Sequence, residues 1–156
     1  MQFLTVAFFG HRYIENIALV EHLLEKHIER LLLENEYVFF LVGRNGDFDR
    51  CVSSSVVRIQ KRMGKERGSL VLVLPYVTAE FQNNQQSFEE YYGDIEISHK
   101  ASVAHPKAAI QIRNREMADR ADLVICYVNQ DCGGAFQAVR YAKKQNKPIL
   151  NLAELE

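Results

Sequence analysis

The chain has 156 residues, 47% of them hydrophobic and 25% charged, which predicts one domain whose core needs no disulfide or metal to be stable. Its 19 basic and 20 acidic side chains give a formal net charge of −1. This balance disfavours nucleic acid as a partner, because nucleic-acid-binding domains usually carry a basic excess. No apolar run reaches the ~20 residues of a membrane-spanning helix, so we expect no membrane partner.

Apolar segments of strand length alternate along the chain with longer amphipathic segments. Each apolar run is predicted to be a strand, and the runs cover residues 4–9, 37–42, 69–74, 123–128 and 148–152. In the first amphipathic segment apolar residues recur at spacings of three and four, as at Val20, Leu24 and Ile28, which is the period of a helix. Helices are predicted over residues 15–35, 49–63, 106–120 and 133–145.

The order of these elements predicts the fold class. The five strands are continuously apolar, which indicates a sheet covered on both faces, and strands separated by helices give a parallel, doubly wound sheet. We therefore expect a single α/β domain over residues 1–156, with a Rossmann-like sheet of about five parallel strands and helices on both faces. Right-handed crossovers place the strand-to-helix loops at the carboxyl edge, where ligands bind near the reversal of strand order.

Three loops at this edge are rich in glycine. Gly10 follows the first strand, Gly43 follows the second, and Gly133 and Gly134 stand at the start of the helix after the fourth. Glycine permits positive φ and a close approach of a ligand to the backbone, and a Gly-Gly pair at a helix start leaves amide N–H groups for a phosphate. Ordinary tight turns of an α/β fold are the alternative explanation for each glycine.

Polar side chains in and near these loops fit an anionic ligand. Arg12 can place two N–H groups on a phosphate or carboxylate. His11 can bond a ribose or a base or act as a proton donor, and its alternative is a loop side chain that packs against its neighbours. The helix phase brings Arg113 or Asn114 to the buried side, where a guanidinium is costly unless it pairs with a carboxylate or a ligand. The alternative there is a surface helix with internal ion pairs, such as Arg113 with Glu116.

Residues 75–105 show no clear periodicity, and we expect them to form a long irregular segment. Within this segment, residues 79–96 hold five acidic residues, no basic residue and several aromatic residues. Connections of this length often form lids or binding loops, and Tyr91 or Tyr92 could stack on a base. The alternative is an insertion that packs against a second subunit, which would make the protein a homo-oligomer, or that stays mobile.

The sequence contains no motif for metal or nucleophilic chemistry. The three cysteines, Cys51, Cys126 and Cys132, are too scattered for a disulfide framework or a metal site, and they fit a reducing compartment. The start of the chain lacks the basic segment of a secretory signal, so we expect a cytoplasmic protein. No nucleophile elbow or phosphate-binding lysine loop is present. The sequence therefore assigns no catalytic residue, metal or cofactor.

Several of these motifs occur together in one order: Gly10-His11-Arg12, the glycine-rich turn ending in Phe48-Asp49, Pro75, Arg113-Asn114-x-x-Met117 and Gly133-Gly134. The chain thereby resembles the YpsA-like family of the SLOG superfamily, which is related to the Lonely-guy phosphoribohydrolases and the DNA-processing DprA proteins. The resemblance implies a Rossmann-like sheet and a site for a nucleotide or nucleotide-derived ligand, such as an ADP-ribose or NAD fragment. With Gly43 of the second loop included, the candidate ligand-binding residues are Gly10, His11, Arg12, Gly43, Asp49, Arg113, Asn114, Gly133 and Gly134.

One position separates this chain from the enzymes that it resembles. The similarity to the Lonely-guy enzymes and to nucleoside deoxyribosyltransferases places Ala138 where those enzymes have a glutamate. Cleavage of an N-glycosidic bond needs a carboxylate to attack or to stabilise the oxocarbenium ion. We therefore expect a module that binds a nucleotide-derived small molecule. The alternative is a nucleoside or nucleotide N-glycosidase that uses His11 or a relocated carboxylate such as Asp49, and a purely structural role in a larger assembly is a third hypothesis.

Overall fold

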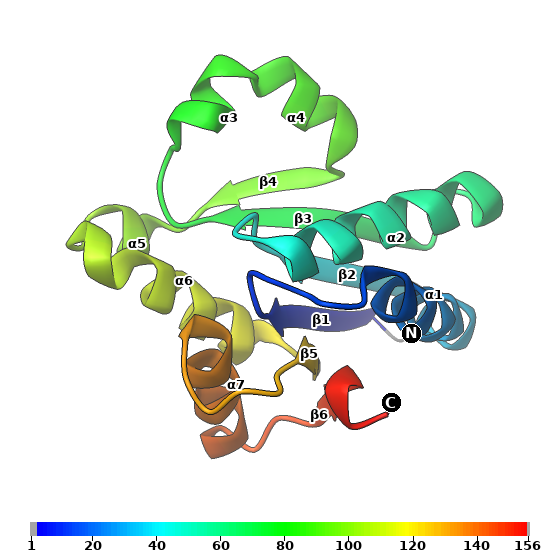
Figure 1. The fold of residues 1–156 in the computed structure, drawn as a ribbon. Helices are drawn as coiled ribbons and strands as arrows, with labels where there is room; N and C mark the ends of the chain where they lie inside the picture. Colours follow the sequence, from blue (N-terminus) through cyan, green and yellow to red (C-terminus); the bar gives the residue numbers. More distant parts are fainter. Residues whose placement is uncertain (1–2, 156) are drawn as a thin grey trace.

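The structure is a computed structural model that describes residues 3–155, and it contains a six-stranded, all-parallel sheet in the order β4-β3-β2-β1-β5-β6 (Figure 1). The strands are β1 (Phe3–Gly10), β2 (Tyr37–Val42), β3 (Gly68–Leu74), β4 (Asp94–Ile97), β5 (Leu123–Tyr127) and β6 (Ile149–Asn151). The predicted Rossmann-like α/β fold is confirmed, and the strand β4 adds one member to the five that the sequence predicted.

Helices cover both faces of this sheet. They are α1 (Ile17–Glu34), α2 (Asp47–Met63), α3 (Ala79–Asn83), α4 (Gln85–Tyr91), α5 (His99–Ser102), α6 (Pro106–Arg120), α7 (Gly134–Lys144) and the 3-10 helix η1 (Leu152–Glu154). Residues of α1 and α2 pack in one hydrophobic cluster with the sheet, and residues of α6 and α7 pack in a second one. Within residues 3–155, no helix combines the length and the apolar character that crossing a bilayer requires.

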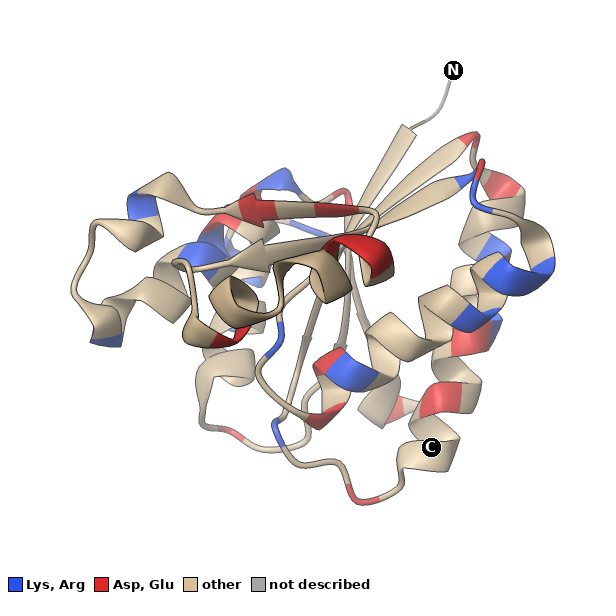
Figure 2. Cartoon of the chain, turned by 90° about the horizontal axis from the view of Figure 1, so that it is seen from above, with Lys and Arg blue, Asp and Glu red and all other residues tan. Residues whose placement is uncertain are grey.

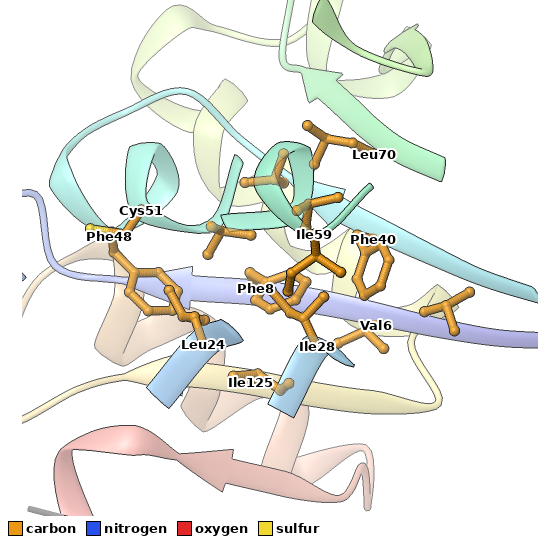
Figure 3. Close-up of a cluster of buried hydrophobic side chains, with 14 of the residues drawn as sticks. Val6, Phe8, Leu24, Ile28, Phe40, Phe48, Cys51, Ile59, Leu70 and Ile125 are labelled. Atoms are coloured by element: carbon orange, nitrogen blue, oxygen red, sulfur yellow. The ribbon is translucent and has the colours of Figure 1, made fainter. Parts of the chain in front are cut away.

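The alternation of side chains along each strand explains why the strands are continuously apolar. In β1, Val6 and Phe8 belong to the cluster with α1 and α2, whereas Ala7 and Phe9 belong to the cluster with α6 and α7. Successive side chains of a strand point to opposite faces, so a strand covered on both sides needs apolar residues at every position. Figure 3 shows the first cluster, in which Phe8 lies among side chains from the two helices and the neighbouring strands.

Residues 75–105 form regular elements, whereas the sequence predicted an irregular segment. They contain α3, α4, β4 and α5, and α3 and α4 form an arch beside the edge strand β4 (Figure 1). The hydroxyl of Thr78 caps α3 by accepting the N–H of Phe81 at 3.1 Å. The helices α3 and α4 have only 5 and 7 residues, too few to display a helical period. β4 has only four residues and alternates acidic and apolar residues, as an edge strand with one covered face does.

The strand order reverses beside β1, and this reversal positions the site. From β1 the chain builds outward to β2, β3 and β4, and it then returns to place β5 on the other side of β1. The loops that follow β1, β2 and β5 consequently open at the carboxyl edge around one point. In open parallel sheets this point is where a crevice for a ligand forms.

Candidate ligand-binding site

A cavity of about 410 Å³ lies at this point of the carboxyl edge. It is bounded by the loops after β1, β2 and β5, by α6 and by the start of α7. All nine residues that the sequence named as candidates line it: Gly10, His11, Arg12, Gly43, Asp49, Arg113, Asn114, Gly133 and Gly134. We call it the Arg113 cavity. That these residues bind a ligand remains a prediction, but the topology brings all of them to one place.

Arg113 forms the buried floor of this cavity. Its residue is 3% exposed, in line with the helix phase that predicted its position. Its guanidinium donates three hydrogen bonds, from Nε to Asn114 Oδ1 at 3.0 Å, from Nη1 to the carbonyl of Val73 at 3.0 Å and from Nη2 to Asn45 Oδ1 at 2.8 Å. All three acceptors are neutral, so these bonds fix the orientation of the guanidinium without neutralising its charge.

The charge of Arg113 has no carboxylate in direct contact. Among residues 3–155, no salt bridge joins Arg113 to an acidic side chain, and Glu116 instead accepts a hydrogen bond from Ser98 at 2.7 Å. Burial lowers the pKa of Arg113, and the negative charge of Asp49 opposes that shift. An arginine stays protonated nonetheless. The cavity floor therefore carries a buried positive charge that an anion would stabilise.

Asp49 contributes the one carboxylate among the described lining residues. It stands in the first turn of α2, and its Oδ2 accepts the N–H of Asn45 at 2.9 Å. Burial raises the pKa of Asp49, while the N–H of Asn45 and the positive charges of Arg113 and Arg12 act in the opposite direction. Asp49 and Arg113 thus lie near each other across Gly43 without forming a contact ion pair.

His11 and Arg12 stand at the mouth of the cavity. The Nε2 atom of His11 accepts the N–H of Asn129 at 3.1 Å, and this bond joins the loop after β1 to the loop after β5. Burial lowers the pKa of His11, which favours the neutral ring, and the acceptor role of Nε2 places the ring proton on Nδ1. The Arg12 residue is exposed, and its carbonyl accepts the N–H of Asp47 at 2.8 Å, so the backbone at the mouth is held while the guanidinium stays accessible.

The structural reason why glycine occupies these loop positions differs from one position to the next. A Cβ on Gly10 would lie 2.1 Å from the ring of Phe48, so this glycine is explained by packing of the protein against itself and not by a ligand's approach to the backbone. Gly133 has φ +95° and is the N-cap of α7, a conformation that favours glycine. A Cβ on Gly134 would meet only Gln111 Nε2, at 3.5 Å. Gly134 is therefore a glycine that neither packing nor a positive φ explains.

The start of α7 is open to an anion. The helix has no side-chain cap and no acidic residue in its first turn. Its first N–H groups therefore donate no hydrogen bond to a capping side chain and face no carboxylate of that turn. Gly133, Gly134 and Ala135 line the Arg113 cavity. The first N–H groups of a helix and its dipole favour negative charge. The cavity thus combines a buried guanidinium with a helix N-terminus.

Three further observations complete the site. Ala138, the position where the sequence resemblance implies a glutamate in other proteins, is 1% exposed, packs in the cluster beneath α7 and lies outside the described cavity lining. No group of three or more His, Cys, Asp or Glu side chains in the described part of the chain could hold a metal. Sequence reasoning missed Tyr13 and Asn45 as lining residues, although Asn45 lies within the glycine-rich loop that it singled out.

The fold recurs in known structures, although no family model and no curated protein matches the sequence. One such structure is DNA processing protein A from Helicobacter pylori, which was described for its unique single-stranded DNA binding mode. It superposes with a TM-score of 0.67 and 17% sequence identity, and the superposition covers 94% of this chain and 63% of the Helicobacter pylori chain. DNA processing protein A (DprA) from Streptococcus pneumoniae superposes with a TM-score of 0.66 and 16% sequence identity. That superposition covers 94% of this chain and 49% of the Streptococcus pneumoniae chain. The present chain thus spans about half to two thirds of those proteins, and what it shares with them is the α/β fold.

Proposed function

We propose that the Arg113 cavity binds a phosphate-bearing nucleotide or nucleotide-derived small molecule, and that the chain is a SLOG-type binding domain of the YpsA-like kind. The observation that carries the proposal is Arg113, a residue that is 3% exposed and whose guanidinium bonds only neutral acceptors in a cavity that the uncapped start of α7 also lines. A buried cation in such a place is most stable when an anion occupies the cavity.

The hydrogen-bonding groups of the cavity are mostly donors. Arg113 has five N–H groups and uses three of them within the protein. The side-chain oxygens of Asn45 and Asn114 already accept from Arg113, which leaves their amide N–H groups for other acceptors. Arg12 and the Nδ1–H of His11 add further donors. A ligand that fits this set is rich in acceptors and negatively charged, as a phosphate or pyrophosphate is.

Each part of such a ligand has a counterpart in the site. Gly133 and Gly134 would hold a phosphate through backbone N–H groups, while Arg12 and Arg113 would neutralise it. Asn114 or Asp49 would contact a ribose hydroxyl. The fold likeness supports a ligand of the nucleotide class, because the Helicobacter pylori protein is described by how it binds single-stranded DNA.

A mononucleotide fits this chain better than a long polyanion does. The formal net charge is −1, and in the view of Figure 2 basic and acidic residues are interspersed along the same helices and loops. Several arginines are already paired with glutamates, as Arg58 is with Glu21 and Glu25. Binding of a long strand would need many unpaired cations along a path.

Thermal unfolding in the presence of ligands tests the proposal. The panel contains AMP, ADP, ADP-ribose, NAD, ribose 5-phosphate and a dT oligonucleotide, each with wild type, Arg12→Gln and the control Arg140→Gln. Arg140 is an exposed residue of α7 outside the described cavity lining. A mononucleotide at a hundred times its Kd should stabilise the wild type by about 2.7 kcal/mol.

The Arg12→Gln variant should unfold at the wild-type temperature without ligand and bind the same nucleotide about tenfold more weakly, because it loses a charge-assisted hydrogen bond. The Arg140→Gln control should bind as the wild type does. Stabilisation by none of the small molecules would contradict the proposal and favour a purely structural role. Tight binding of the oligonucleotide alone would make the partner a nucleic acid.

Hydrolysis of an N-glycosidic bond is the second candidate function, and Asp49 is the observation that favours it. Its carboxyl group lines the cavity and has a raised pKa, which is a property of general acids. Incubation with nucleoside monophosphates and chromatography of the products tests this function. Release of free base that disappears in Asp49→Asn would make the protein an enzyme, and absence of release would leave binding as the function.

A further inference from the structure

A second cavity of about 410 Å³ lies on the other side of the loop between β2 and α2. Gly43 and Asp49 line both cavities, so the two are neighbours that share this loop as a wall. The second cavity is bounded by the first turns of α1, by α2 and by the end of α4. We call it the Tyr91 cavity, after the aromatic residue at its rim.

The basic side chains around the Tyr91 cavity are engaged within the protein. Arg44 donates to both carboxylate oxygens of Glu80, at 2.9 and 3.1 Å, and to the hydroxyl of Tyr92 at 2.9 Å. It also lies over the ring of Phe88, 4.7 Å from its centroid. Unlike Arg113, it therefore bonds a carboxylate of the protein itself, and its positive charge is balanced there.

Two of the three acidic side chains that line this cavity are paired in the same way, and the third, Asp49, accepts the N–H of Asn45. Asp47 accepts from Arg50 and from the N–H of Ile14, and Glu21 accepts from Arg58 at 2.6 Å. Since these charges balance one another, the Tyr91 cavity offers no unbalanced positive charge to an anion. In this balance of charge it differs from the Arg113 cavity.

The uncharged groups of this cavity that a ligand can contact are an aromatic ring, an aliphatic side chain and a hydroxyl. Tyr91 and Ile17 are each 42% exposed and stand at the rim. The ring of Tyr91 is held by an edge-on contact with Tyr92, with centroids 5.0 Å apart and planes at 80°, and Tyr92 is held by Arg44. The side chain of Ser53 adds a hydroxyl to the lining. An uncharged planar ring with polar edges matches such a surface, because it can stack on tyrosine and bond a hydroxyl.

We infer that the two cavities hold the two ends of one nucleotide, with its phosphate in the Arg113 cavity and its base against Tyr91 in the second cavity. The inference rests on the proposed function and specifies it: the ligand is a nucleoside phosphate whose sugar passes over the loop that the two cavities share. The electrostatic contrast between the cavities matches the contrast between the two ends of that molecule. Tyr91 then acts as the residue that recognises the base.

Calorimetric titration of matched ligands tests this arrangement. AMP, GMP, CMP and UMP are compared with ribose 5-phosphate, which carries the phosphate and sugar without a base, on wild type, Tyr91→Ala, Tyr91→Phe and the control Phe3→Ala. Phe3 is an exposed aromatic residue at the start of β1, outside the described linings of both cavities. At least one nucleoside monophosphate should bind the wild type more tightly than ribose 5-phosphate does.

Tyr91→Ala should weaken that nucleotide about tenfold and leave the affinity for ribose 5-phosphate unchanged, because stacking is lost and the phosphate contacts remain. Tyr91→Phe keeps the ring and should bind as the wild type does, and so should Phe3→Ala. An unchanged nucleotide affinity in Tyr91→Ala, or an equal loss for both ligands, would overturn the placement of the base while leaving phosphate binding in place. If neither ligand binds the wild type, the proposed function fails and this inference fails with it.

Discussion

A single buried guanidinium, that of Arg113, determines what kind of molecule the carboxyl edge can hold. Its burial was predictable from the helix phase, because Met117 one turn later faces the sheet and is 1% exposed. Its partners were not predictable. Asn45 and Val73 meet it only because the loop after β2 and the end of β3 converge on α6, and no spacing in the sequence encodes that convergence.

Substitution of Gly134 tests the role of the α7 N-terminus. Gly134→Val should reduce the affinity for a phosphate-bearing ligand by at least about tenfold through steric blockage, while the unfolding temperature changes little. The fold should tolerate the change, because a Cβ there meets only Gln111 Nε2, at 3.5 Å. Calorimetry measures the affinity, and Gly134→Ala should give a smaller loss. An affinity equal to that of the wild type would remove the helix start from the site.

His11 should make stability depend on pH. Its pKa in the folded protein is lowered from 6.5 by burial, and protonation of Nε2 would break the bond to the N–H of Asn129. A histidine with a lowered folded pKa contributes its full stability above the unfolded pKa, and that contribution falls as pH drops below 6.5 toward the folded value. The free energy of unfolding should therefore decrease as pH is lowered through this window.

Denaturant titrations from pH 8 to pH 5 measure this effect. His11→Gln keeps an acceptor without titrating, so its stability should fall less than that of the wild type. His27, which is buried and also has a lowered pKa, contributes equally to both proteins and cancels in the comparison. The exposed His22 supplies the control variant His22→Gln. Parallel curves for the wild type and His11→Gln would show that the bond to Asn129 does not depend on the charge of His11.

At the scale of elements, the part of the chain that differs most from the sequence prediction is the arch of α3 and α4. The long elements follow from apolar runs and helical periods, so the bounds of α6 were predicted as Pro106–Arg120 and found there. The arch is instead held by tertiary contacts. Arg44 joins it to the end of β2 through Glu80 and Tyr92, and contacts between residues this far apart in sequence leave no local pattern.

Removal of Arg44 should loosen the arch without unfolding the sheet. In Arg44→Met, amide hydrogen exchange should become faster in α3 and α4 and stay unchanged in α1 and α2, because the link to Glu80 and Tyr92 is lost. Hydrogen exchange followed by mass spectrometry resolves these segments. The matched control is Arg62→Met, which breaks a surface pair with Glu29 on the helices α2 and α1. Unchanged exchange in the arch would mean that its aromatic contacts suffice to hold it.

At the scale of the whole molecule, a parallel sheet with one reversal of strand order explains why distant loops form one site. The sequence was sufficient to predict this, because continuous apolar strands separated by helices leave few topologies. Residues as far apart in the sequence as Gly10 and Gly134 therefore line the same cavity. The chemical identity of the ligand does not follow from topology, since it depends on which charges remain unbalanced after folding. Arg44 bonds the carboxylate of Glu80, whereas Arg113 bonds only neutral acceptors.

The most direct test of one anion-binding cavity is a crystal structure of the protein with the nucleoside monophosphate that stabilises it most. The phosphate should lie within hydrogen-bonding distance of the Arg113 guanidinium and of backbone N–H groups at Gly134 and Ala135, with Arg12 closing over it. A phosphate bound elsewhere on the molecule, with the guanidinium of Arg113 still bonded only to Asn114, Asn45 and Val73, would contradict the account.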